Sequence, residues 1–163
     1  MGARSAAVPL ALSLGGCTTV DLPAGSAPLD PIGFFSGVSH GEGTLDTLIA
    51  RPVRVSVASQ GFPELGGLKL VQRIREGEKP ERVRSWTMRK SGPSSYTGTL
   101  TDAEGPVAIV VEGPRALVRY TTPSGLRIQQ QLALQADGRT ILNRLHAYKF
   151  GIRVAVLDET IRK

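Results

Sequence analysis

Three polar residues close together in the first third of the chain could support acid–base or metal chemistry. His40, Glu42 and Asp46 are separated by even numbers of residues, so on a β-strand their side chains share one face. An imidazole beside a carboxylate can act as a general acid–base pair or form a weak metal site. Three ligands on one strand give poor tetrahedral geometry without a further ligand from elsewhere. We therefore expect solvated side chains at the rim of the fold, and no metal.

The second histidine lies in a late segment of alternating character. On a strand, Arg144, His146 and Tyr148 share one face. Small β-barrels that hold haem use a histidine from a late strand, and such a site needs an apolar pocket and an oriented imidazole. A histidine between an arginine and a tyrosine more often faces solvent. We expect no cofactor, and a haem or metal site at His146 or His40 is the weaker alternative.

No other pattern indicates a familiar catalytic centre. The segment Gly41-Glu42-Gly43 is not followed by the helix and lysine of a phosphate-binding loop. It is typical of the first strand of lipocalin-like barrels, where small residues let the strand bend. Serines and histidines show no triad or nucleophile-elbow spacing. Asp158 and Glu159 are adjacent, so they point to opposite faces of the last strand. The sequence gives no support to an enzyme.

The elements that must position these residues are β-strands. Short runs rich in Val, Ile, Leu, Thr and Tyr alternate with Gly, Pro, Asp and Ser turns, at a spacing of about 8–12 residues. Ile128, Gln130 and Leu132 fall on one face of such a run, and Arg127 and Gln129 fall on the other. Strands are predicted to begin near the following residues: Gly41, Val53, Leu68, Arg82, Ser95, Val107, Ala116, Leu126, Arg139 and Ile152.

About eight to ten strands joined by hairpins predict an all-β fold, a single antiparallel up-and-down barrel of lipocalin-like (calycin-like) architecture. Closure removes the exposed edges that such a meander would otherwise have. A short helical turn is expected from Asp30 to Phe35, at one mouth of the barrel. The outward faces carry Arg and Gln where a transmembrane barrel would need apolar side chains.

A barrel of this size has room for side chains and one small molecule. The residues expected to face the interior form a mostly apolar set with a few polar groups, which is typical of ligand pockets. A small apolar or amphipathic ligand is therefore one interpretation, and a filled core in a structural or interaction protein is the other. The inward residues are Trp86, Met88, Val107, Ile109, Val118, Tyr120, Ile128, Gln130 and Leu132.

The N-terminus has the features of a bacterial lipoprotein signal peptide. Arg4 precedes an apolar stretch from Ala6 to Leu14, and Leu14-Gly15-Gly16-Cys17 supplies small residues before a cysteine. We expect residues 1–16 to be removed and Cys17 to carry palmitate and anchor the protein in the membrane. Thr18 in place of an aspartate favours the outer membrane, facing the periplasm. The alternative is a soluble N-terminus with one free cysteine.

Residues 17–31 combine Pro, Gly and Ser without periodicity, which predicts a flexible tether before a barrel domain at 32–163. The net charge is +6, and 15 of the 20 basic residues are arginines scattered along the chain. Only eight aromatic residues are available for base stacking. We therefore expect no nucleic-acid partner, although an acidic ligand or anionic head groups would suit this charge.

Several segments, in this order and spacing, resemble the bacterial lipoprotein family catalogued as domain of unknown function 3833. The resemblance spans nearly all of Phe34 to Lys163 and implies a lipocalin-like barrel in the cell envelope, without a known activity. That family usually has an aromatic residue within 38–43 and a more acidic stretch at 64–70. The matching segments are Gly33-Phe34-Phe35-Ser36-Gly37, Ser85-Trp86-Thr87, Tyr96-Thr97-Gly98-Thr99, Leu142-Asn143-Arg144, Tyr148–Val154 and Ile161-Arg162-Lys163.

Overall fold

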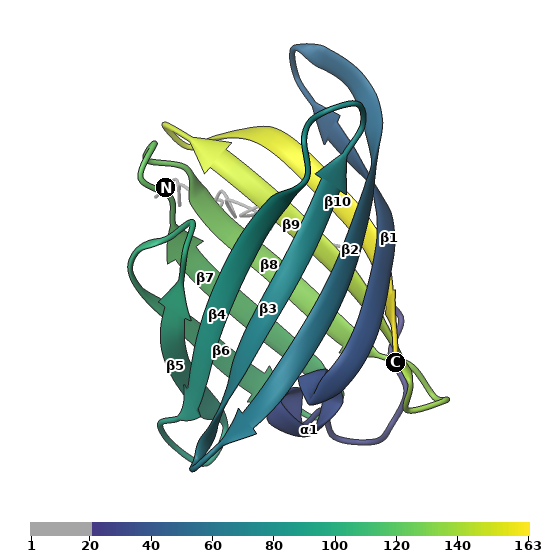
Figure 1. Ribbon diagram of the computed structural model, residues 1–163, viewed down its shortest axis with the longest axis vertical. Helices are drawn as coiled ribbons and strands as arrows, with labels where there is room; N and C mark the ends of the chain where they lie inside the picture. The colour runs from purple at the N-terminus through teal and green to yellow at the C-terminus, as the bar shows by residue number, and fades with distance from the viewer. Residues whose placement is uncertain (1–20) are drawn as a thin grey trace, which may run out of the picture.

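The chain folds into a closed barrel of ten antiparallel strands with one short helix at its lower mouth (Figure 1). The computed structural model describes residues 21–163, so the predicted signal peptide and Cys17 lie outside the described residues. The prediction of an all-β, up-and-down, lipocalin-like barrel is confirmed. Within residues 21–163, no helix is long and apolar enough to cross a bilayer.

Every strand pairs with its neighbours in the chain, and the last strand pairs with the first. Thr47 lies opposite Ala155 and His40 opposite Arg162 in the pairing that closes the barrel. Because no edge is left unpaired, every strand is held on both sides. The elements are α1 (Pro31–Phe35), β1 (Gly37–Thr47), β2 (Ala50–Glu64), β3 (Gly67–Glu76), β4 (Arg82–Lys90), β5 (Ser95–Leu100), β6 (Glu104–Glu112), β7 (Arg115–Thr121), β8 (Arg127–Leu134), β9 (Thr140–Lys149) and β10 (Ile152–Arg162).

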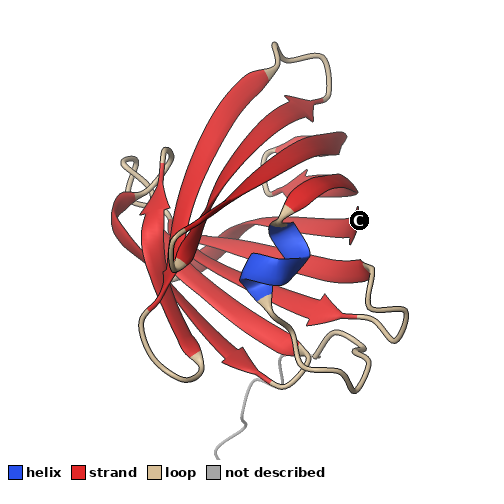
Figure 2. Cartoon of the chain, turned by 60° about the horizontal axis from the view of Figure 1, so that its bottom comes forward, coloured by secondary structure: helices blue, strands red, loops and turns tan. Residues whose placement is uncertain are grey.

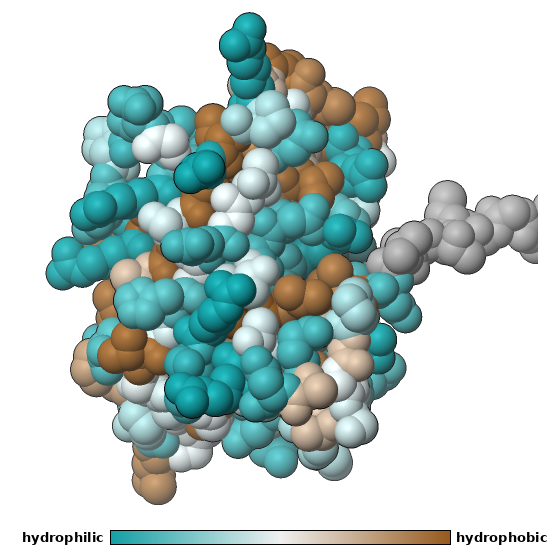
Figure 3. All heavy atoms as spheres, turned by 90° about the vertical axis from the view of Figure 1, so that its right-hand side faces the viewer, coloured by the Kyte–Doolittle hydropathy of each residue, from teal (hydrophilic) through white to brown (hydrophobic). Residues whose placement is uncertain are grey.

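Alternate residues of the strands are buried, as the period of two in the sequence indicates. In β6, Val107 and Ile109 are buried while Ala108 and Val110 are exposed. The face of the barrel shown in Figure 3 is mostly hydrophilic, with apolar side chains scattered among polar ones and a group of them at the upper end. The outer face of the barrel wall therefore meets solvent, and its inner face surrounds the interior, here called the lumen.

Helix α1 closes one end of the lumen, here called the floor (Figure 2). The carboxylate of Asp30 accepts a hydrogen bond from the Ile32 amide at 3.1 Å and so caps the helix, and Pro31 occupies the first turn. Phe34 and Phe35 are buried and stack edge to face, with ring centroids 5.0 Å apart. Gly61 of β2 lies against the Phe35 carbonyl, where a Cβ atom would overlap it. The predicted helical turn is thus the floor of the barrel.

The segment before α1 does not behave as the expected tether. The Gly25 amide donates to the Leu134 carbonyl at 2.7 Å, and the Leu29 amide donates to the Gly113 carbonyl at 2.8 Å. Leu29 is buried in the main core, and Arg115 donates to the Leu22 carbonyl. Because these bonds satisfy backbone groups that would otherwise face solvent, residues 22–31 already belong to the folded barrel domain, which the sequence placed from Ile32 onward.

Candidate functional site: a polarised barrel lumen

The lumen contains a cavity of about 230 Å³. All eight side chains proposed from the sequence as ligand contacts line it, whereas Val107 is buried in the core beside it. Their alternate positions on β4 and β6–β8 point inward because each strand presents one face to the barrel axis. These lining residues are Trp86, Met88, Ile109, Val118, Tyr120, Ile128, Gln130 and Leu132.

The two ends of the cavity differ. At the floor it is bounded by Pro31 and Phe35 of α1, which are buried. At the other end it reaches Arg82 and Asp102, whose side chains are 48% and 36% exposed. We call this second end the open end. A molecule in the lumen would therefore meet apolar groups at the floor and charged groups where the cavity reaches solvent.

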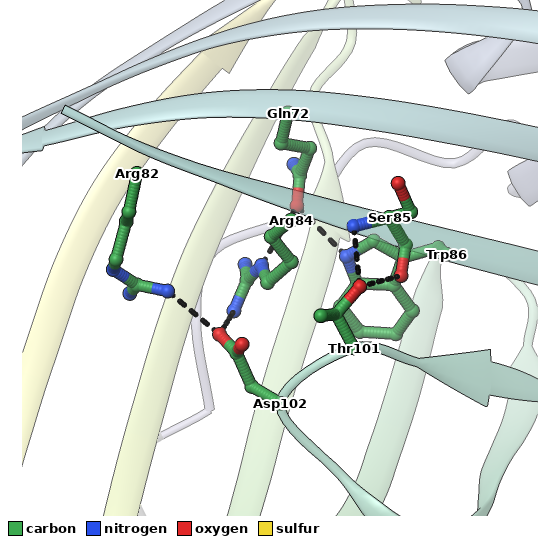
Figure 4. Close-up of polar contacts among 7 residues, drawn as sticks. All are labelled: Gln72, Arg82, Arg84, Ser85, Trp86, Thr101 and Asp102. Carbon is green, nitrogen blue, oxygen red and sulfur yellow. Dashed lines mark hydrogen bonds and ion pairs between the residues drawn. The ribbon is translucent and has the colours of Figure 1, made fainter.

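A hydrogen-bonded cluster on β3 and β4 forms one wall of the lumen (Figure 4). The Gln72 side-chain oxygen accepts from Arg84 Nε at 3.1 Å and from the Trp86 indole at 2.8 Å. The guanidinium of Arg84 also lies 5.4 Å from the centre of the Trp86 ring. The Gln72 amide nitrogen in turn donates to Ser59 Oγ at 3.1 Å. These contacts hold the arginine and the indole in fixed positions.

The charge on Arg84 is only loosely compensated. Its one ion-pair contact among residues 21–163 is with Asp102, at 3.9 Å. That carboxylate lies much closer to Arg82, at 2.6 Å, so two cations share it. Burial lowers the pKa of Arg84, which shows the cost of keeping its cation away from water. An arginine starts from such a high pKa that it stays charged.

Tyr120 extends this wall toward β7. Its ring meets that of Trp86 edge to face, with centroids 6.1 Å apart. Burial raises the pKa of the Tyr120 hydroxyl, so the phenol stays neutral and can donate a hydrogen bond. The wall formed by β3, β4 and β7 thus offers a cation, an indole and a phenol.

The opposite wall, from β8 to β10, offers mainly acceptors. Asn143 Nδ2 donates to Glu159 at 2.7 Å, and burial raises the pKa of the Glu159 carboxyl, which favours its neutral form. The Asn143 and Gln130 side-chain oxygens are buried and have no hydrogen-bond partner among the described residues. Gly41 of β1 makes room for the Glu159 side chain, since a Cβ there would overlap the carboxyl group.

Sequence reasoning included Tyr120 and Gln130 but missed the charged residues of this site and the amides of Gln72 and Asn143. Arg84 precedes Trp86 by two residues, so the period of two already placed it on the inward face. Glu159 faces inward and Asp158 outward, as expected from their adjacency, but the buried member was not recognised as part of the lumen. Gln72 and Asn143 carried no signal beyond alternation within their strands.

Neither histidine lines the lumen cavity. His40, Glu42 and Asp46 share the exposed face of β1, as the spacing predicted. His146 lies on the outer face of β9 with its ring edge-on to that of Tyr148, at 6.1 Å. Burial and the nearby Arg153 and Arg144 lower the pKa of His146. Among residues 21–163, no group of three or more His, Cys, Asp or Glu side chains could hold a metal ion.

Comparison with known proteins supports the fold. No protein-family model matches the chain, and no curated protein matches its sequence. Among solved structures, the barrel is similar to the S-type phycobiliprotein lyase CPES from Guillardia theta, with a TM-score of 0.62. The match covers 81% of this chain and 89% of that chain at 4% sequence identity. At this identity the similarity shows a shared lipocalin-like barrel.

Proposed function

We propose that the lumen binds one small amphipathic molecule and that a lipid on Cys17 holds the protein at the bacterial outer membrane, facing the periplasm. The observation that carries the ligand-binding proposal is a cavity with an apolar floor and a charged open end. At roughly 30 Å³ for each water-sized group, a cavity of about 230 Å³ has room for about eight non-hydrogen atoms. The unpartnered oxygens of Gln130 and Asn143 also favour a guest, because buried acceptors without donors are costly.

The first test is native mass spectrometry of the full chain extracted from its own membranes, with an absorption spectrum of the same sample. A stoichiometric extra mass supports the proposal and reveals the ligand class. A Soret band would instead favour haem, and it would have to disappear in His146→Ala. A clean mass for the protein alone would count against a resident ligand.

Blocking the lumen gives a second test with a matched control. Ile109→Trp and Leu132→Trp place a large ring in the cavity, so they should abolish ligand uptake while the barrel persists. Val110→Trp places the same ring on the exposed face of β6, where the side chain is 42% exposed, and uptake should be unchanged. Uptake that survives both inward substitutions would contradict a site in the lumen.

The anchor has an independent test. Cys17→Ser should leave an unprocessed precursor that palmitate no longer labels, because the lipid is attached through the thiol. Labelling that persists in this variant would contradict the anchor and the envelope location, but not ligand binding in the barrel.

A structural or interaction lipoprotein is the second candidate, favoured by apolar side chains at strand turns. Ile49, Leu65 and Phe150 are each more than nine-tenths exposed. Ile49 and Phe150 lie at the same end of the barrel, where the Leu48 amide donates to the Val154 carbonyl, and an apolar patch formed by adjacent turns is typical of contacts with another protein. Crosslinking in intact cells would test this function: a specific envelope partner that is lost on Ile49→Ser would support it.

A further inference from the structure

We propose that the ligand of the lumen is a small amphipathic acid whose carboxylate is bound by Arg84, an inference that rests on the proposed ligand-binding function. The apolar part of the ligand would extend toward the floor, and the carboxylate would lie near the open end. Three separate features of the cavity lead to this assignment.

The first feature is an arginine that no close carboxylate neutralises. Arg84 lines the cavity, and its side chain is only 15% exposed. Its Nε is engaged by Gln72, and its ion-pair partner Asp102 lies 3.9 Å away beside Arg82. A guanidinium binds a carboxylate through two parallel hydrogen bonds. A buried cation with such weak compensation is a good site for an anionic group.

The second feature is that the carboxylates lining the cavity are either already paired with cations or held neutral by burial. The charged and titratable groups that face Arg84 are Tyr120, Arg82, Asp102 and Glu159. Tyr120 is a neutral phenol, and burial favours the neutral form of Glu159 across the lumen. Asp102 is shared by two arginines, and Glu76, which also lines the cavity, is paired with Lys79. Arg84 is therefore the cation of the lumen wall that has no close carboxylate of its own.

The third feature is the direction of polarity along the barrel. Strand β4 starts at Arg82 beside the open end and runs toward the floor, so Arg84 precedes Trp86 and Met88 along the cavity wall. Met88 pairs with Gly98 and Leu68, and the lining near the floor is completed by Phe35 of α1. A carboxylate near Arg84 places an attached hydrocarbon chain among apolar side chains, where its burial is favourable.

The experiment compares straight-chain acids and alcohols of equal length, from hexanoate and hexanol to dodecanoate and dodecanol, with the full chain at neutral pH. Trp86 is the only tryptophan and lies beside Arg84, so its fluorescence reports occupation of this site. We expect the best acid to bind at least tenfold more tightly than the matching alcohol. Arg84→Met should remove that preference while leaving alcohol binding within about twofold.

Two further variants separate charge at this position from charge in general. Arg84→Lys keeps a cation but loses the planar fork, so it should retain part of the preference for acids. Arg119→Met removes an exposed arginine from the outer face of β7 and should leave all affinities unchanged. Circular dichroism and thermal melting check the fold of Arg84→Met. If Arg84→Met is unstable, the test still rests on Arg84→Lys.

The outcomes distinguish the two proposals. Equal binding of acid and alcohol by the wild type, or an acid preference that survives in Arg84→Met, overturns the assignment of Arg84 and leaves the ligand-binding function standing. Binding of neither series by the wild type overturns the ligand-binding function, and this inference with it.

Discussion

Replacing Phe35 by alanine tests whether α1 closes the barrel. The Phe35 side chain is 8% exposed, packs edge to face against Phe34, and forms part of the lumen floor. Truncation of a buried phenylalanine to alanine costs about 3–5 kcal/mol, from lost apolar burial and from the cavity that remains. Because one side of this ring already faces a cavity, fewer contacts are lost than in a solid core. We expect a loss of about 3 kcal/mol in the free energy of unfolding.

Urea denaturation followed by Trp86 fluorescence measures this loss, and the melting temperature should fall by about 10 °C. Phe150→Ala is the matched control, because this ring is 92% exposed and its removal should change stability by less than about 0.5 kcal/mol. The same truncation lengthens the lumen at its floor, so the optimum chain length in the acid series should increase.

A loss below about 1 kcal/mol in Phe35→Ala, similar to that of an exposed site, would refute this reasoning. It would mean that α1 rests on the barrel without sealing it, and that the floor is formed by strand residues. A full loss of stability without any change in chain-length preference would keep the packing role of Phe35 but remove it from the ligand site.

Two further predictions concern the walls of the lumen. Burial raises the pKa of Glu159 above its ordinary value of 4.5, so the folded state holds this proton more tightly than the unfolded chain, and stability should fall as pH rises through the folded pKa. Glu159→Gln lacks this titration, so it should gain stability relative to the wild type as the pH rises above the ordinary carboxyl pKa, and the difference should vanish below it. Parallel pH dependences of the two unfolding free energies would contradict a neutral buried acid. Gly61→Ala places a Cβ against the Phe35 carbonyl and should lower stability by about 2 kcal/mol in thermal melts. Gly61 is not in the left-handed region, so a loss below about 0.5 kcal/mol, as at an exposed site, would contradict the overlap with α1.

Much of the fold could be predicted because a strand is recognised by the alternation of apolar and polar residues between neighbours in the sequence. Successive side chains of a strand face opposite sides, so Ile128, Gln130 and Leu132 were assigned to the lumen before any strand was placed in space. Arg82, Ser95 and Ile152 were predicted as strand starts and are the first residues of β4, β5 and β10. Turn glycines supplied most of the remaining boundaries.

The conformation of the turn between β9 and β10 could not be predicted, because its residues are unusual there. Phe150 and Gly151 connect β9 to β10, and Phe150 has a φ of 50°, in the left-handed region. Asparagine or glycine is favoured at such a position, and a bulky aromatic residue there gives no turn signal.

By itself, the sequence determined the strand class, the turn positions and which apolar side chains face inward, because these depend on neighbours within a few residues. Only the tertiary structure decided the register in which β1 pairs with β10, the packing of the segment 22–29 on β7 and β8, and the placement of Arg84 and Glu159 across the lumen from each other. From the sequence alone, an inward arginine or glutamate cannot be told from a solvated surface residue, because its burial depends on the closure of the barrel. Closure changes its surroundings from water to protein, and that change creates the polar end of the candidate site.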